Sequence, residues 1–236
     1  MSMTKSLCSF VATVCVYRSC TPPNPTIKSE RVSRKNVFDR WVHSIQYVNR
    51  PFNILVCVIG FAEVAAIIAS YLPSWAFSEH IVSMLLARRN PQDLQFTPFS
   101  MMGLLLIVAG STLREYCYRS LRRLFTFDVT IRKGHKLITT GPYGFVRHPS
   151  YTGLVAVFFG SLLWYGSRGS WVRESGILET TIGKGVIGFV IVIFVVAIVG
   201  LLGRMRFEDA ELRKTFGREW EEWAQRVPCF LIPGVY

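Results

Sequence analysis

Four stretches of this 236-residue chain are free, or nearly free, of charged side chains, and they limit the folds that the chain can adopt. Stretches 97–113, 148–167 and 185–203 hold no Asp, Glu, Lys or Arg, and 51–78 holds only Glu63. A helix that crosses the hydrocarbon core of a bilayer needs roughly 17–25 apolar residues. We therefore predict an all-α polytopic membrane protein with four to five transmembrane helices.

The composition argues against the alternative, a large soluble helical protein with buried core helices. Only 18% of the residues are charged and 50% are hydrophobic, whereas a soluble domain carries about a quarter charged residues. Four apolar stretches in a chain of this length leave too little polar surface to cover such a core.

The basic side chains, which give a net charge of +12, alternate along the chain as four membrane crossings require. They number seven between 18 and 50, two at 88–89, eight in 114–147, three in 168–184 and six in 204–226. Cytosolic loops carry the excess of Lys and Arg, so the middle loop and the C-terminal tail are predicted to face the cytosol. Because topology and a partner of anionic lipid account for the charge, we expect no nucleic-acid partner.

The N-terminal 50 residues are predicted to form a segment with a basic, Pro-rich linker, followed by a membrane domain over 51–236. Residues 1–20 are compatible with a short hydrophobic segment, a membrane-surface segment or an unstructured end. The six cysteines form no CxxC pair and the four histidines are scattered, so the sequence predicts no metal site.

Glu63 is the one charge inside a predicted span. A carboxylate at that depth is costly unless it is paired or faces a cavity. We favour a helix–helix contact for Glu63 over a functional role.

The segment 147–153, with the sequence RHPSYTG, stands where the third apolar stretch begins. Pro149 fits the first turn of a helix, where its missing N–H costs nothing. The free backbone N–H groups of that turn attract an anionic group, and Ser150 and Tyr151 add hydroxyls. The segment is predicted either to form the rim of a pocket for a polar ligand or to be a helix start with interfacial anchors.

Arg204 and Glu208 follow the last apolar stretch and share one helical face because they are four residues apart. An arginine near the interface can grip a carboxylate with two hydrogen bonds. Glu208 can accept hydrogen bonds from two adjacent hydroxyls, such as a ribose diol. The alternative is a surface ion pair without a function.

These elements together resemble a known enzyme family. The stretch HKLITTGPYGFVRHPSYTG (135–153), the Arg-x-x-x-Glu spacing at Arg204 and the segment FGREWEEWAQRVP (216–228) are similar to the isoprenylcysteine carboxyl methyltransferases. Members of that family are multi-pass enzymes of the endoplasmic reticulum membrane. With S-adenosylmethionine they methylate the C-terminal carboxylate of a prenylated cysteine in CaaX-processed proteins. The resemblance covers 125–228 and implies a cytosolic cofactor pocket formed by the middle loop and the C-terminal helix.

The resemblance also implies the roles of individual residues. Arg204 corresponds to the catalytic arginine that faces the substrate carboxylate. The cofactor-binding positions correspond to His135, Lys136, Leu137, Ile138, Tyr143, His148, Pro149, Ser150, Tyr151 and Glu208. No metal is implied.

The chemistry of the residues agrees with carboxyl methylation, and it leaves alternatives. A carboxylate is already ionised at pH 7 and needs no general base. A phospholipid N-methyltransferase, which shares the RHPxYxG element, would need a base for its ammonium proton, and Arg204 would repel that ammonium group. A membrane sterol-type reductase would need a nicotinamide site, and no GxGxxG fingerprint is present. A non-enzymatic membrane scaffold would bind no S-adenosylmethionine at all.

Overall fold

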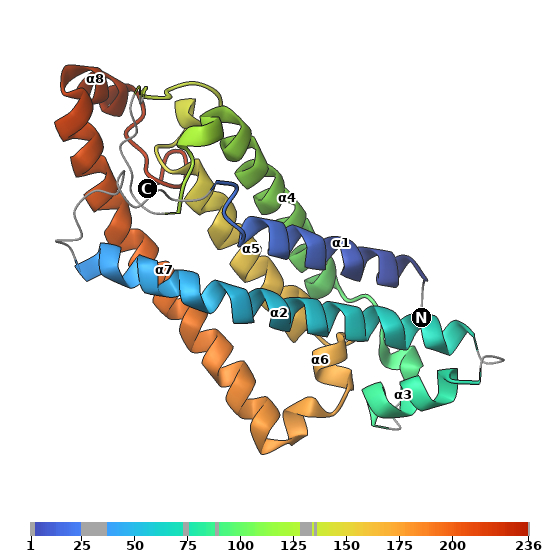
Figure 1. Cartoon of the computed structure of the whole chain (residues 1–236). Coiled ribbons are helices and arrows are strands. Elements are labelled where there is room, and N and C mark those ends of the chain that lie inside the picture. Colours follow the sequence, from blue (N-terminus) through green and yellow to red (C-terminus); the bar gives the residue numbers. More distant parts are fainter. Residues whose placement is uncertain are drawn as a thin grey trace. The chain divides into compact units, whose positions relative to one another are not determined.

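The computed structural model describes residues 3–24, 37–72, 76–87, 90–127, 134 and 136–235, without the side chains of 37–48. In these ranges all regular structure is helical. The α-helices in Figure 1 are α1 (Met3–Ser19), α2 (Val37–Tyr71), α3 (Ser78–Leu86), α4 (Pro98–Leu121), α5 (Pro149–Gly166), α6 (Trp171–Glu174), α7 (Thr181–Phe216) and α8 (Arg218–Arg226). The described connections between them contain four short 3-10 helices: η2 (Pro91–Asp93), η3 (Arg122–Leu124), η4 (Gly141–Gly144) and η5 (Ile177–Glu179).

The apolar stretches of the sequence are helical, but three helices have different bounds from those stretches. Helix α2 begins at Val37, before the predicted start at Pro51, and ends at Tyr71. Its end lies two residues before Pro73, and a proline disfavours helical structure in the residue that precedes it. Helices α4 and α7 continue past their apolar stretches to Leu121 and Phe216, because Arg, Glu, Leu and Lys are good helix formers outside the apolar part as well.

Two of the described helices are long and apolar enough to cross a membrane: 49–71 of α2, and α7. The most apolar part of α7 is only 17% buried inside the protein, against 44% for α2. Helix α7 therefore presents apolar side chains to its surroundings over most of its circumference, as a helix in lipid does.

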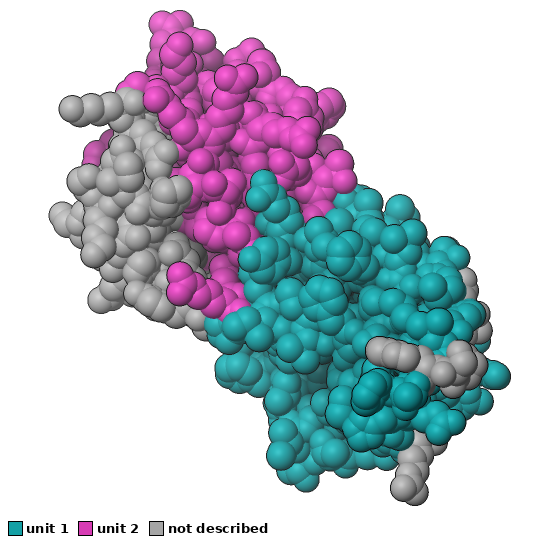
Figure 2. Space-filling view, turned by 45° about the vertical axis from the view of Figure 1, so that its right-hand side comes forward, with its two compact units in different colours: residues 1–18, 51–109, 156–193 teal, residues 19–50, 110–155, 194–236 magenta. Residues whose placement is uncertain are grey.

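The chain divides into two compact units, each made of three separate stretches, coloured differently in Figure 2. Unit 1 comprises 1–18, 51–109 and 156–193, and unit 2 comprises 19–50, 110–155 and 194–236.

Unit 1 has a small apolar core from α2, α3 and the segment that follows η2. Its buried members are Ala66, Ile67, Leu86 and Leu94. The indole of Trp171 packs against this core and donates a hydrogen bond of 3.0 Å to the carbonyl oxygen of Leu85. Because Met3–Ser19 form a regular helix, α1, the possibility of an unstructured end is wrong for these residues.

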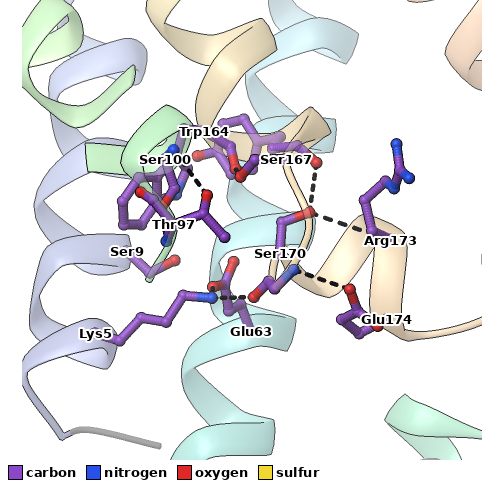
Figure 3. A network of polar contacts seen from close by, with 12 residues as sticks. Lys5, Ser9, Glu63, Thr97, Ser100, Trp164, Ser167, Ser170, Arg173 and Glu174 are labelled. Atoms are coloured by element: carbon purple, nitrogen blue, oxygen red, sulfur yellow. Dashed lines mark hydrogen bonds and ion pairs between the residues drawn. The ribbon is translucent and has the colours of Figure 1, made fainter. Parts of the chain in front are cut away.

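The carboxylate of Glu63 is paired with an amine from α1, so the expected helix–helix contact is present in unit 1. The Lys5 Nζ and Glu63 Oε1 atoms are 2.7 Å apart, and the two side chains are 2% and 1% exposed. Lys5 also donates a hydrogen bond to the carbonyl oxygen of Gly169. Figure 3 shows the Lys5 ammonium group directed at the Glu63 carboxylate within a cluster of polar side chains. Lys5 and Glu63 are thus each paired with an opposite charge on another helix, which offsets part of the cost of burying them.

Helices α4 and α5 approach each other closely in unit 1 because glycines face each other. A Cβ atom placed on Gly160 would lie 2.7 Å from the carbonyl oxygen of Gly103 and 2.8 Å from the backbone nitrogen of Ile107. Small residues at such contacts let two helix backbones pack directly, which is a common device in membrane helix pairs.

We expect Gly160→Ala to lower the free energy of unfolding by about 1–3 kcal/mol, because the added methyl group meets backbone atoms that cannot rotate away. The measurement is the thermal unfolding midpoint in detergent micelles. The matched control is Gly188→Ala in α7, where the added carbon has no neighbour within 4 Å beyond the adjoining residues and backbone of its own helix. If both variants unfolded at the same temperature, the close α4–α5 contact would be wrong.

Candidate active site

The apolar core of unit 2 forms the floor of a pocket. Its buried members are Cys117, Tyr118, Phe125, Tyr143, Trp223 and Val227. Gly141 has a φ of 62°, in the left-handed region that favours glycine, and it begins the η4 turn that brings Tyr143 into this core. The Trp223 indole in α8 donates a hydrogen bond of 3.0 Å to the carbonyl oxygen of Tyr143. The turn and the C-terminal helix are therefore held together by a buried polar contact.

The space in and directly in front of the pocket is about 920 Å³, including open solvent. Residues from the end of α4, the middle loop, α5 and the C-terminal part of the chain line the pocket. The apolar and aromatic lining residues are Leu121, Leu124, Phe125, Leu137, Ile138, Tyr143, Tyr151, Leu212 and Trp223. The polar lining residues are Thr126, Lys136, Arg147, His148, Ser150, Glu208 and Glu211. A mostly apolar hollow with a few polar groups is the usual form of a site for a small organic ligand.

Asp209 of α7 holds the segment before α5 in place. Its side chain is 8% exposed, and its carboxylate oxygens lie 2.7 Å from Arg147 Nη1 and 3.1 Å from His148 Nε2. A buried carboxylate that meets two neighbouring side chains fixes the orientation of both. The sequence did not assign this role to Asp209, although its position next to Glu208 was visible.

The C-terminal tail also holds the segment before α5 in place, through residues 229–231. The backbone N–H groups of Arg147 and His148 each donate a 2.9 Å hydrogen bond, to the carbonyl oxygens of Cys229 and Phe230. The Arg147 guanidinium lies 3.9 Å from the centre of the Phe230 ring. Thr152 Oγ1 donates to the carbonyl oxygen of Leu231 at 2.7 Å. This tail is a second structural element of the site that sequence reasoning missed, because no local pattern marks it.

Glu208 lines the pocket, and the protein contacts one of its two carboxylate oxygens. The Tyr151 hydroxyl donates a 2.7 Å hydrogen bond to Glu208 Oε2, and Arg204 Nε lies 3.8 Å from the same oxygen. In the part of the chain that the structure describes, the other oxygen, Oε1, accepts no hydrogen bond. Glu208 therefore combines one oxygen fixed by the protein with one that is available to a ligand.

Eight of the ten residues expected to hold a cofactor line the pocket: Lys136, Leu137, Ile138, Tyr143, His148, Ser150, Tyr151 and Glu208. Pro149 is buried in the first turn of α5 and does not line the pocket. His135 lies outside the described residues. Arg204 does not line the pocket either; it is 4% exposed, beside Glu208, and donates a hydrogen bond to the carbonyl oxygen of Phe127.

Sequence reasoning missed several lining residues. Glu211 and Leu212 lie about one helical turn beyond Glu208 on α7, so helical spacing alone could have found them. The apolar lining residues Leu121, Leu124 and Phe125 could not be found in this way, because they belong to the stretch that the sequence placed in a loop.

The hydroxyl of Tyr143 remains protonated at neutral pH. Burial raises the pKa of Tyr143 well above its ordinary value, and the nearby Cys117 and Glu208 raise it further. Tyr143 is therefore neutral, and it can contact a ligand as a hydrogen-bond donor or acceptor or through its ring.

The helical fold and the pocket define a membrane-type methyltransferase when they are taken with the similarities of the sequence. Residues 99–173 match the sequence profile described as phospholipid methyltransferase. A probable protein-S-isoprenylcysteine O-methyltransferase of Oryza sativa is 31% identical over 156 residues, 65% of this chain and 70% of the relative. The protein-S-isoprenylcysteine O-methyltransferase B of Arabidopsis thaliana is 34% identical over 128 residues, 53% of this chain and 55% of the relative.

The chain therefore belongs to the family of the protein-S-isoprenylcysteine O-methyltransferases. A weaker similarity links it to the Delta(14)-sterol reductase of Ascobolus immersus, with 27% identity over 46% of this chain and 21% of the relative. This pattern agrees with the RHPxYxG element being shared more widely than the family itself.

Proposed function

We propose that this protein transfers a methyl group from S-adenosylmethionine to the C-terminal carboxylate of a prenylated cysteine. The observation that carries the proposal is the pocket itself. It gathers Glu208, the turn at Tyr143 and the start of α5 around one hollow, with the Arg204 guanidinium adjacent. These are the groups that a cationic methyl donor and an anionic acceptor need.

The residues of the pocket fit S-adenosylmethionine. The pocket is open to solvent on one side, so a ligand as long as a nucleoside with an amino-acid arm can extend beyond its mouth. Leu137, Ile138 and Trp223 supply apolar surface for the adenine ring, and Glu208 Oε1 can accept hydrogen bonds from ribose hydroxyls. When bound, this cofactor supplies a methyl group on a positively charged sulfur, and its transfer to a carboxylate oxygen cancels one positive and one negative charge.

The protein's own side chains need to position the acceptor and exclude water. Arg204 orients the acceptor carboxylate, and its charge lowers the energy of that carboxylate in an apolar site. No group has to remove a proton, since the carboxylate is ionised at neutral pH. Proximity and the low polarity of the pocket supply the acceleration.

The wider setting is part of the proposal. Helices α2, α4, α5 and α7, with α1 as a fifth, form the four to five membrane spans, and the pocket faces the cytosol at the endoplasmic reticulum membrane. The substrates are prenylated proteins of the CaaX type. The membrane domain extends over 51–236, and 125–228 carries the site.

The test is methyl transfer from labelled S-adenosylmethionine in membranes that contain this protein. The acceptors are N-acetyl-S-farnesylcysteine and, in parallel, phosphatidylethanolamine, because the profile match to phospholipid methyltransferases makes lipid the second candidate. We expect base-labile label on the prenylcysteine alone. Label on the lipid would replace the proposal with phospholipid N-methylation, and label on neither acceptor with folded protein would reject both.

We expect Glu208→Gln to raise the KM for S-adenosylmethionine by about tenfold or more, because an amide is a weaker acceptor for hydroxyl hydrogen bonds than a carboxylate. The KM for the prenylcysteine should change much less. Glu219→Gln is the control, since Glu219 is an exposed carboxylate in α8 that does not line the pocket. An unchanged cofactor KM in Glu208→Gln would remove Glu208 from this role.

A further inference from the structure

Arg114 of α4 is a buried cation next to the pocket that the proposed mechanism leaves unused. The residue is only 2% exposed, and hydrogen bonds and aromatic rings fix its side chain. Nε donates a 3.0 Å hydrogen bond to the carbonyl oxygen of Ser19. Nη1 donates to the carbonyl oxygen and to the hydroxyl of Ser150, at 2.9 and 3.1 Å. The guanidinium also lies 5.3 Å from the ring centre of Tyr118 and 5.8 Å from that of Phe127.

The charge of Arg114 has no counter-charge among the described residues. Among the described lysines and arginines, Lys5 and Arg204 are also buried, and each has a carboxylate within 4 Å: Glu63 at 2.7 Å and Glu208 at 3.8 Å. In the described part of the chain, the contacts of Arg114 are with neutral oxygens and aromatic faces. A buried cation without an anion is costly, so this arrangement suggests that a bound ligand supplies the missing negative charge.

Ser150 is the group through which Arg114 reaches the pocket. It lines the pocket from the first turn of α5. A serine hydroxyl has one hydrogen to donate and two acceptor positions, and Arg114 occupies one of the acceptor positions. Within the described residues no oxygen accepts the Ser150 hydrogen. The hydroxyl is thus available as a donor, next to the N-terminal N–H groups of α5, whose dipole favours an anion.

We propose that Arg114 is a positioning residue that turns the Ser150 hydroxyl toward a ligand carboxylate in the pocket and balances its charge. The inference rests on the proposed function, because both ligands of that reaction carry a carboxylate. One is the amino-acid carboxylate of the methyl donor and the other is the terminal carboxylate of the prenylcysteine. The chemistry recognised by Arg114 and Ser150 is the same in the two cases.

The experiment compares ligands with and without that carboxylate by equilibrium binding to the whole purified protein in detergent. The donor pair is S-adenosylmethionine and its decarboxylated analogue. The acceptor pair is N-acetyl-S-farnesylcysteine and its C-terminal amide. The variants are Arg114→Met, Arg114→Lys and Ser150→Ala. Arg119→Met is the control, because Arg119 lies on the same helix with its side chain 78% exposed.

We expect Arg114→Met and Ser150→Ala to weaken the carboxylate-bearing ligand of one pair by about 10- to 100-fold. Its carboxylate-free analogue should lose less than about threefold. Arg114→Lys should recover part of the affinity, because it restores the charge without the fork of donors. The pair that responds identifies the source of the carboxylate, and Arg114→Lys and Ser150→Ala keep the test available if Arg114→Met does not fold.

Equal losses for both members of a pair would make Arg114 a purely structural group and overturn the inference. Unchanged affinity in every variant would overturn it as well. Wild-type protein that binds no S-adenosylmethionine would instead reject the proposed function, so the two failures are distinguishable.

Discussion

Replacing Arg204 by alanine is expected to lower kcat/KM for a prenylcysteine acceptor by about 100- to 1,000-fold, the range found when a donor to reacting oxygens is removed. Arg204 is 4% exposed and lies at the point of α7 where the helix leaves its apolar stretch. Its side chain is anchored by the carbonyl oxygen of Phe127 and by Glu208. A guanidinium fixed in this way grips a carboxylate with little loss of side-chain entropy.

A loss confined to the acceptor, with cofactor binding unchanged, distinguishes the role of Arg204 from a general loss of structure. Arg204→Ala should still bind S-adenosylmethionine with an affinity close to that of the wild type. Arg204→Lys should recover part of kcat/KM, since it keeps the charge. Arg206→Ala, on an exposed side chain two residues further along α7, is the matched control. Wild-type kinetics in Arg204→Ala would show that another group holds the acceptor carboxylate.

The sequence predicted those parts of the site that depend on local pattern. Pro149 marks the start of α5 because proline is favoured in the first turn of a helix, where its missing N–H costs nothing. Arg204 and Glu208 share a face of α7 because their spacing is one helical turn, and their ion pair at 3.8 Å follows from it.

The parts that depend on distant contacts could not be predicted in this way. Arg114 was counted as a loop residue because the apolar stretch ends at residue 113, whereas α4 continues to Leu121. Tertiary packing determines the contacts of Asp209 with Arg147 and His148. It also determines the hydrogen bonds between the C-terminal tail and the segment before α5. Hydropathy shows where a helix can cross a bilayer, but not which charged side chains are buried at its ends.

Hydropathy also did not show which side chain pairs with Glu63, and the loss of that pairing is the second large effect that we expect. The sequence showed that this carboxylate needed a partner, and the structure provides Lys5 from α1. Lys5→Met is expected to lower the free energy of unfolding by about 3–5 kcal/mol, because it leaves a buried carboxylate without its counter-charge. In a chain of this size that corresponds to a fall of roughly 10 °C in the thermal unfolding midpoint. Lys184→Met, at an exposed lysine of α7, is the control.

The double variant Lys5→Met, Glu63→Leu separates the ion pair from simple packing. With both charges removed, the desolvation penalty of each is removed as well, and similar apolar side chains fill the space. The double variant is therefore expected to be more stable than either Lys5→Met or Glu63→Leu, with a coupling of the size found for contacting residues, up to about 3 kcal/mol. Unfolding midpoints of the four proteins in detergent give this cycle directly. If the two single losses simply added in the double variant, the pair would not be coupled. The attachment of α1 to α2 would then have to come from the apolar contacts around it, such as that between the Phe10 and Phe61 rings, whose centres are 6.4 Å apart.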